Sequence, residues 1–170
     1  MGKSVILCQF ISDWYNLLIM TGLIGEFEST LDSKNRFLLP AGVKRQLPPD
    51  EARFFVINKG FEGCLSLYPL KTWEPLIARI SKLSDFDPKA REFRRFFLNG
   101  ATPVEPDSAG RILLSANLKE HAGLEKDIVL VGVGEKFEIW DSNKYKKLFE
   151  SLSEEAFSNL AKEIMDKPEN

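Results

Sequence analysis

The sequence predicts an α+β fold in which two tandem copies of one unit build a single β-barrel-like core with helices at its periphery. The first observation is an internal repeat: the stretch LDSKNRFLLP, residues 31–40, returns as PDSAGRILLS, residues 106–115. The second is a pair of segments with alternating β-branched and aromatic residues, which is typical of hairpins. Neither copy contains enough strands to complete a sheet alone, so we expect both copies to contribute to one barrel.

Each repeated stretch reads as a strand, a tight turn and a second strand. Asp32 and Asp107 open the turns, and Arg36 and Arg111 follow directly after them. An aspartate at the start of a turn can accept hydrogen bonds from backbone N–H groups two residues on, which fixes the turn and aims the next side chain. In the first turn Asn35 is the non-glycine residue that best tolerates a left-handed backbone.

A short helix is predicted after each turn. In the first copy Pro40 suits the first turn of a helix, and Val43 and Leu47 share one face of it. In the second copy Ser115 is the expected N-cap, and Gly123 supplies the left-handed stop.

Hairpins and amphipathic helices complete the two copies. The hairpins are predicted within residues 54–69 and 127–141. A helix is expected after each hairpin, between the copies and near the end of the chain. These predicted helices are 73–83 with Thr72 as N-cap, the segment within 87–100 that Asp87 caps and Gly100 stops, 143–152, and 153–165.

Composition excludes several classes of function. The 170 residues are 44% hydrophobic with a formal net charge of −2, so the chain does not coat nucleic acid by bulk positive charge. Cys8 and Cys64 form no C-x-x-C pair, which disfavours a zinc site. The sequence contains no phosphate-binding loop or nucleophile elbow, and His121 has no second histidine as a partner. We therefore expect no catalytic residues, no metal, no cofactor and no small-molecule substrate.

The N-terminal segment, residues 1–19, is rich in apolar side chains, but Gln9, Asp13 and Asn16 interrupt it. A signal sequence or a membrane span needs a cleaner apolar run. We expect a soluble, cytoplasmic protein without a membrane partner, and we predict that residues 1–19 are dispensable.

The paired D-x-x-x-R motifs, with GEFESTLD, GCLSLYPLKTWE, REFRRFFLNGA and LVGVGEKFEIWD, resemble the MraZ family of bacterial transcriptional regulators. The resemblance covers Gly25 to Leu152. It implies a duplicated AbrB-like, swapped-hairpin fold, a ring-shaped homo-oligomer, and binding to direct repeats in the promoter of the division and cell wall operon, as a nucleoid-associated repressor. Asn35 replaces the usual glycine and Ser115 the usual proline, and both changes are mild.

The resemblance also suggests a division of the chain. The expected parts are an N-terminal extension at 1–24, a first AbrB-like repeat at 25–84, a connecting helix at 85–103, a second repeat at 104–152, and a C-terminal helix and tail at 153–170.

Cations gather in the first copy, and this suggests where DNA binds. A salt-bridge clamp between Asp32 and Arg36 explains the aspartate but not the neighbouring cations, which suit phosphates and guanine edges. The second copy keeps only Arg111 and Lys119, so its Asp107–Arg111 motif is expected to be structural or interfacial, with DNA contact as a further option. The predicted DNA-binding residues are Arg36, Lys34, Asp32, Lys44 and Arg45.

Two alternatives remain open. The basic cluster of Lys89, Arg91, Arg94 and Arg95 is either a second DNA contact or a solvated helix face. A protein of this fold could also be an AbrB-like antitoxin or a ring-forming interaction protein. An antitoxin would usually carry a flexible arm after a single DNA-binding copy, whereas here a second copy follows the first.

Overall fold

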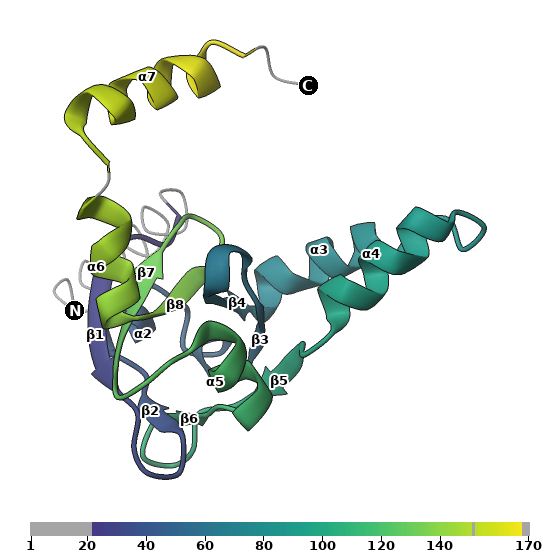
Figure 1. Ribbon diagram of the computed structural model, residues 1–170. Coiled ribbons are helices and arrows are strands. Elements are labelled where there is room, and N and C mark those ends of the chain that lie inside the picture. Colours follow the sequence, from purple (N-terminus) through teal and green to yellow (C-terminus); the bar gives the residue numbers. More distant parts are fainter. Residues whose placement is uncertain (1–21, 151, 168–170) are drawn as a thin grey trace, which may run out of the picture.

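Two hairpins, one from each copy, lie side by side in the middle of an antiparallel sheet (Figure 1). The computed structural model describes residues 22–150 and 152–167. Within this part of the chain, β4 of the first hairpin pairs with β8 of the second, which joins the two copies at the centre. The hairpin strands are β3 (Phe55–Lys59), β4 (Leu65–Pro69), β7 (Asp127–Gly132) and β8 (Phe137–Asp141).

The outer strands are exchanged between the copies. β1 (Glu26–Thr30) of the first copy pairs with β7 of the second, and β5 (Thr102–Val104), which leads into the second repeat, pairs with β3 of the first. The resulting order is β1-β7-β8-β4-β3-β5. In the repeat, β1 corresponds to β5, β3 to β7 and β4 to β8. Exchanging these counterparts and reading the order from the other end gives the same order again. The sheet thus has an approximate twofold topology, and each copy supplies an edge that the other needs.

The sheet is open, which corrects the expectation of a barrel-like core. In the described part of the chain, β1 and β5 are the two edges, and they do not pair with each other. β5 is only three residues long and contains Pro103, which has no N–H to donate to a further strand. The core is closed instead by a separate two-stranded ribbon, in which β2 (Arg36–Leu38) pairs with β6 (Arg111–Leu113). Side-chain packing, rather than a continuous ladder, therefore encloses the interior.

The core lies between this ribbon, the sheet and two short helices. Phe37 and Ile112, at the middle of the ribbon strands, are fully buried in this core. Helix α2 (Ala41–Lys44) contributes Val43, and α5 (Ala116–Ala122) contributes Leu118. Full burial of an aliphatic or aromatic side chain stabilises a fold by about 1.5–3 kcal/mol, so this single core holds both copies together.

The longer helices confirm most predicted boundaries. They are α3 (Leu70–Ser81), α4 (Pro88–Leu98), α6 (Ser142–Glu150) and α7 (Glu154–Met165), and two short 3-10 turns span Glu51–Arg53 and Phe61–Gly63. Asp87 caps α4, as expected. By contrast, α3 begins before Thr72, because the backbone of Pro69 already has the extended geometry of an N-cap; the Thr72 hydroxyl donates to the Pro69 carbonyl from inside the helix.

Two helical features project from the body of the molecule in Figure 1: the antiparallel α3–α4 pair and the C-terminal α7. No helix in the described ranges is long and apolar enough to cross a membrane. The prediction that residues 1–19 are dispensable lies outside the described residues. Leu23, a few residues after this segment, is buried and forms an isolated β-bridge with Gly134. The chain is therefore packed into the fold from this residue.

Candidate nucleic-acid interface

The first turn is fixed by one aspartate, as its sequence predicts. Asp32 Oδ1 accepts hydrogen bonds from the backbone N–H groups of Lys34 at 2.8 Å and Arg36 at 2.9 Å. Its other oxygen, Oδ2, accepts from Arg36 Nε and Nη2, both at 2.8 Å. Asn35 adopts the expected left-handed conformation, with φ at 58°. The arginine is thus held by the same carboxylate that shapes the turn.

The second turn repeats this geometry although its middle residues differ. Asp107 Oδ1 accepts from the N–H groups of Ala109 and Arg111 at 2.9 Å, and Oδ2 accepts from Arg111 Nε and Nη2 at 2.9 Å. Gly110 takes the left-handed position, with φ at 78°. The two arginines are clamped in the same way, so the clamp by itself does not separate a DNA-binding copy from a structural one.

Both carboxyl groups are more acidic than usual. The backbone N–H and then the guanidinium of Arg36 lower the pKa of Asp32 to about 2. The backbone N–H of Arg111 is the largest cause of the lowered pKa of Asp107. Hydrogen bonds to the ionised form produce such shifts, so both carboxylates are ionised at neutral pH.

The ribbon holds the two turns side by side. Asn35 O accepts a hydrogen bond from Leu114 N, and Gly110 O accepts one from Leu39 N, each at 2.9 Å. The left-handed residue of each turn therefore contacts the strand that follows the other turn. In Figure 1 both turns, with β2 and β6, lie together at the bottom of the molecule.

One lysine from each copy reaches the turn of the other copy. Lys119 Nζ donates to Asn35 Oδ1 at 3.0 Å. Lys44 Nζ lies so close to Gly110 that a Cβ on this glycine would be 2.6 Å from it. Lys44, predicted to bind DNA together with the first turn, thus lies against the second turn. Lys34 is exposed in the first turn, and Arg45 is exposed at the C-terminal end of α2.

The outward face of the ribbon carries residues from both copies. Phe37 and Ile112 point into the core, so their neighbours on each strand lie on the opposite face. There Arg36 is opposite Leu113, and Leu38 is opposite Arg111. Leu38 is 54% exposed and Leu113 is 59% exposed. Neither leucine was among the predicted DNA-binding residues, which were chosen for their charge; the repeated apolar run after each arginine is the signal that could have identified them.

The basic helix α4 lies elsewhere in the fold and holds a loop. Arg94 pairs with the carboxylate of Asp85 and donates to the carbonyl of Leu83. These contacts fix the connection between α3 and α4. Arg94 is therefore not simply solvated, while a DNA contact of this helix stays a prediction.

The other singled-out side chains have structural surroundings. Cys64 is buried, and burial is the main cause that raises the pKa of its thiol to about 12. Trp73 and Trp140 are buried. His121 is exposed and contacts the Gly60 carbonyl at 3.4 Å. In the ranges that the structure describes, no group of three or more histidine, cysteine, aspartate or glutamate residues is arranged to hold a metal ion.

Comparison with known proteins matches both copies. A model of the protein family described as "MraZ protein, putative antitoxin-like" matches residues 23–96 and again residues 97–167. The chain is 39% identical to the transcriptional regulator MraZ of Natranaerobius thermophilus over 84% of this chain and 96% of that protein. It is 43% identical to the protein of the same name from Clostridium beijerinckii, over 84% and 96%. The protein of that name from Christiangramia forsetii is 40% identical, over 86% and 94%.

A solved structure also shows a distant similarity. The solution structure of PHS018 from Pyrococcus horikoshii is 12% identical, covers 68% of this chain and 95% of that chain, and has a TM-score of 0.32. This similarity is too low to bear on the fold.

Proposed function

The chain belongs to the MraZ family, and from this membership we propose that it is a sequence-specific DNA-binding transcriptional regulator that represses its own division and cell wall operon. The relatives are named transcriptional regulators, which supports a function in DNA binding rather than in catalysis. The observation that carries the proposal is the outward face of the β2–β6 ribbon, where both copies present an arginine.

A two-stranded ribbon has the right size to enter the major groove of DNA. Arg36 and Arg111 are preoriented, because each aspartate engages Nε and one terminal nitrogen of its guanidinium and leaves other N–H groups available. Such a group can bind the O6 and N7 atoms of guanine, and an exposed leucine beside it can contact the methyl group of thymine. In this proposal Asp32 is a positioning residue.

The surrounding cations are assigned to the phosphates. Lys34 and Arg45 are exposed and favour the first copy, since Ala109 replaces the lysine in the second turn. Lys119 lies against the first turn and Lys44 against the second. Because Arg111 has the same clamp as Arg36, we extend the proposed DNA surface to both arginines, with the larger contribution from the first copy.

Assembly is the second part of the proposal. With a net charge of −2 and few clustered cations, one protomer should bind DNA weakly. A ring-shaped homo-oligomer would present several ribbons to successive direct repeats, spaced by about one helical turn of roughly 10 bp, and the weak contacts would then combine. The proposed division of the chain is the one given above, with its two repeats at 25–84 and 104–152.

The test compares Arg36→Ala with Arg79→Ala, an exposed arginine on α3. We expect Arg36→Ala to weaken binding to the promoter of the operon by about 1–3 kcal/mol, since a bidentate contact to a base has this magnitude. Its thermal stability should change little, because the partly exposed ion pair of Arg36 with Asp32 lies at the surface, where such pairs contribute about 0–1 kcal/mol. Gel-shift titrations and thermal melts measure both quantities.

The same titrations at several salt concentrations distinguish the contacts. Loss of a phosphate contact lowers the salt dependence of binding, whereas loss of a base contact does not. Arg79→Ala should bind as the unmodified protein does. If Arg36→Ala binds the promoter normally, the ribbon is not the DNA-binding surface.

A further inference from the structure

Each strand of the ribbon carries an arginine and an exposed leucine two residues apart. β2 contains Arg36 and Leu38, and β6 contains Arg111 and Leu113. The residue between them is buried in each strand, so these four side chains lie on the outward face. Two of the three turn residues differ between the copies, whereas this outward pattern is the same in both. Both copies thus keep a leucine that does not belong to the core.

Pairing across the ribbon places each arginine beside the leucine of the other copy. Arg36 is opposite Leu113, and Arg111 is opposite Leu38. The hydrogen bonds between the strands lie on either side of these pairs, so both pairs are of the non-hydrogen-bonded type. In such pairs the Cα atoms are only about 4.5 Å apart and the side chains are close. Each neighbouring arginine and leucine is therefore supplied by two different copies.

Leu38 is held in place by contacts on both sides. The Ser29 hydroxyl donates to the Leu38 carbonyl at 2.9 Å, which ties this strand to β1. Leu38 Cδ1 lies 3.6 Å from the position that a Cβ on Gly110 would occupy. The leucine side chain thus lies against the second turn, next to the arginine that this turn positions. A side chain that is already positioned loses little conformational entropy on binding.

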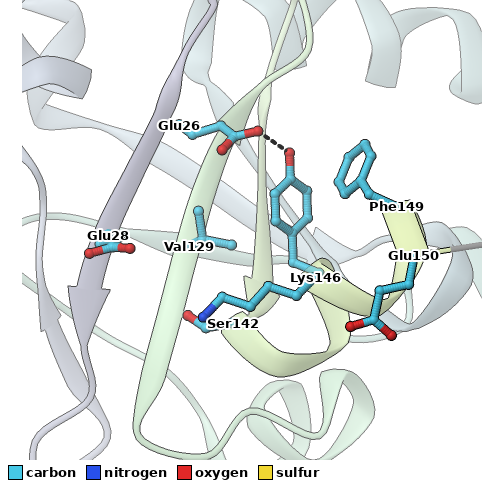
Figure 2. A pocket seen from close by; sticks show the side chains of 8 residues that line it. Glu26, Glu28, Val129, Ser142, Lys146, Phe149 and Glu150 are labelled. Carbon is cyan, nitrogen blue, oxygen red and sulfur yellow. Dashed lines mark hydrogen bonds between the residues drawn. The ribbon is translucent and has the colours of Figure 1, made fainter. Parts of the chain in front are cut away.

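Charge distinguishes these leucines from other exposed apolar surface. A groove between β1 and α6 also has exposed apolar surface, at Phe149 (Figure 2). Its lining includes one lysine, Lys146, and three glutamates, which are Glu26, Glu28 and Glu150. Carboxylates repel the phosphates of DNA, whereas the ribbon leucines lie between two arginines, with a lysine against each adjacent turn. Nucleic acid is therefore the partner that suits the ribbon leucines.

The spacing along the ribbon matches that of base pairs. Residues two apart in an antiparallel strand are separated by about 6.8 Å. This is the rise of two base pairs, at about 3.4 Å each. The two arginine and leucine pairs can therefore face base pairs about two steps apart. Thymine presents a methyl group in the major groove, which is the group that an apolar side chain contacts there.

We propose that Leu38 and Leu113 are specificity-determining residues, and that each contacts a thymine methyl group next to a guanine bound by the arginine across the ribbon. This inference rests on the proposed function and deepens it, because it names the residues that recognise the base beside the guanine. It also makes recognition a joint property of the two copies. The apolar neighbour of Arg36 comes from the second copy and that of Arg111 from the first.

The test uses promoter DNA in which deoxyuridine replaces every thymine, so that base pairing is kept and only the methyl groups are lost. The unmodified protein should bind this DNA roughly fourfold more weakly for each methyl group that it contacts, which is the usual effect of one buried methyl group. The double variant Leu38→Ala with Leu113→Ala should bind thymine DNA and deoxyuridine DNA equally. Gel-shift titrations measure both affinities.

Two further variants serve as controls. Leu160→Ala removes a leucine that is 46% exposed on α7, which lies at the opposite end of the molecule from the ribbon in Figure 1. This variant should distinguish the two DNAs as the unmodified protein does. Leu113→Met keeps an apolar side chain of similar volume and should retain most of the preference for thymine.

Combined variants test the pairing across the ribbon. Arg36→Ala with Leu113→Ala should weaken binding by less than the product of the two single effects, since neighbouring residues that contact adjacent bases act together. Arg36→Ala with Leu38→Ala should come closer to the product. The reverse result would show that each arginine works with the leucine of its own strand and would overturn the assignment across copies.

Several outcomes would overturn the inference as a whole. One is equal affinity of the unmodified protein for the two DNAs, and another is a preference for thymine that survives in the double leucine variant. A third is loss of assembled mass by that variant, measured by light scattering, with its preference for thymine unchanged, because the leucines would then form a protein contact.

Arg36→Ala separates this inference from the DNA proposal. If this variant loses affinity as expected while the leucine variants keep the preference for thymine, only the leucine assignment is wrong. If Arg36→Ala binds the promoter normally, the ribbon surface itself is wrong.

Discussion

Asp32 and Asp107 show how one side chain can both shape a turn and position an arginine. Each uses one carboxylate oxygen for two backbone N–H groups and the other for a guanidinium. Two of the three residues between aspartate and arginine differ in the two copies, yet the contacts are the same. The aspartate, rather than the sequence of the turn, therefore determines where the arginine lies.

The lowered pKa of Asp32 predicts how acid affects the fold. An aspartate in the unfolded chain titrates near its ordinary value of about 3.9, whereas Asp32 in the folded chain titrates at about 2. Between these values the unfolded chain binds more protons, so stability falls as the pH falls through this window and is fully present above it. Asp107 acts in the same direction.

Denaturant unfolding between pH 5 and pH 2 measures this effect, and Asp32→Asn should show a smaller loss of stability over the same range. The carboxyl signal of Asp32 can be followed by NMR in parallel. Titration of that signal at the ordinary value would show that the turn is not held as described.

Among the elements, those defined by local rules were the easiest to predict. Asp87 and Ser115 cap helices through their side chains, and Gly123 ends α5 in the left-handed conformation. The start of α3 was missed because Pro69 provides an alternative to a side-chain cap, and propensity alone does not choose between the two.

Pairing between strands could be predicted only in part. The repeat indicates that the copies share a sheet. The alternation of apolar and polar residues along a strand does not reveal which strand edges pair, so the prediction of a barrel was wrong. The candidate site was limited in the same way. The motif identified Arg36 and Arg111, whereas the proximity of Lys119 to the first turn depends on the exchange between copies.

The cap of α5 gives a prediction at this scale. Ser115 Oγ accepts a hydrogen bond from Leu118 N at 3.3 Å, and the helix that it opens buries Leu118 in the core. Ser115→Ala should therefore lower the free energy of unfolding by about 0.5–2 kcal/mol, the usual effect of losing an N-cap.

Ser108→Ala, in the exposed second turn, is the matched control and should change stability by less than about 0.5 kcal/mol. Chemical denaturation of both variants measures the difference. Equal stabilities would mean that the Ser115 hydroxyl does not contribute to the fold.

For the whole molecule, the exchange of strands makes the two copies one folding unit. A fragment ending at Leu83 would retain the β3–β4 hairpin, but β1 would lose β7 and β4 would lose β8. The ribbon would lose β6, which leaves Phe37 without Ile112 beside it. The twofold topology thus implies that stability is shared rather than divided between the copies.

We therefore predict that this fragment does not fold by itself, because an isolated two-stranded hairpin is marginally stable in water. It should give a poorly dispersed NMR spectrum and no cooperative thermal transition, whereas the full chain melts in one step. Mixing it with the remainder of the chain, from Ser84 onward, should restore dispersion, since the second part supplies β5, β6, β7 and β8. A fragment that melts cooperatively in the absence of this partner would show that the first copy is an independent domain and that the exchanged edges are not required for folding.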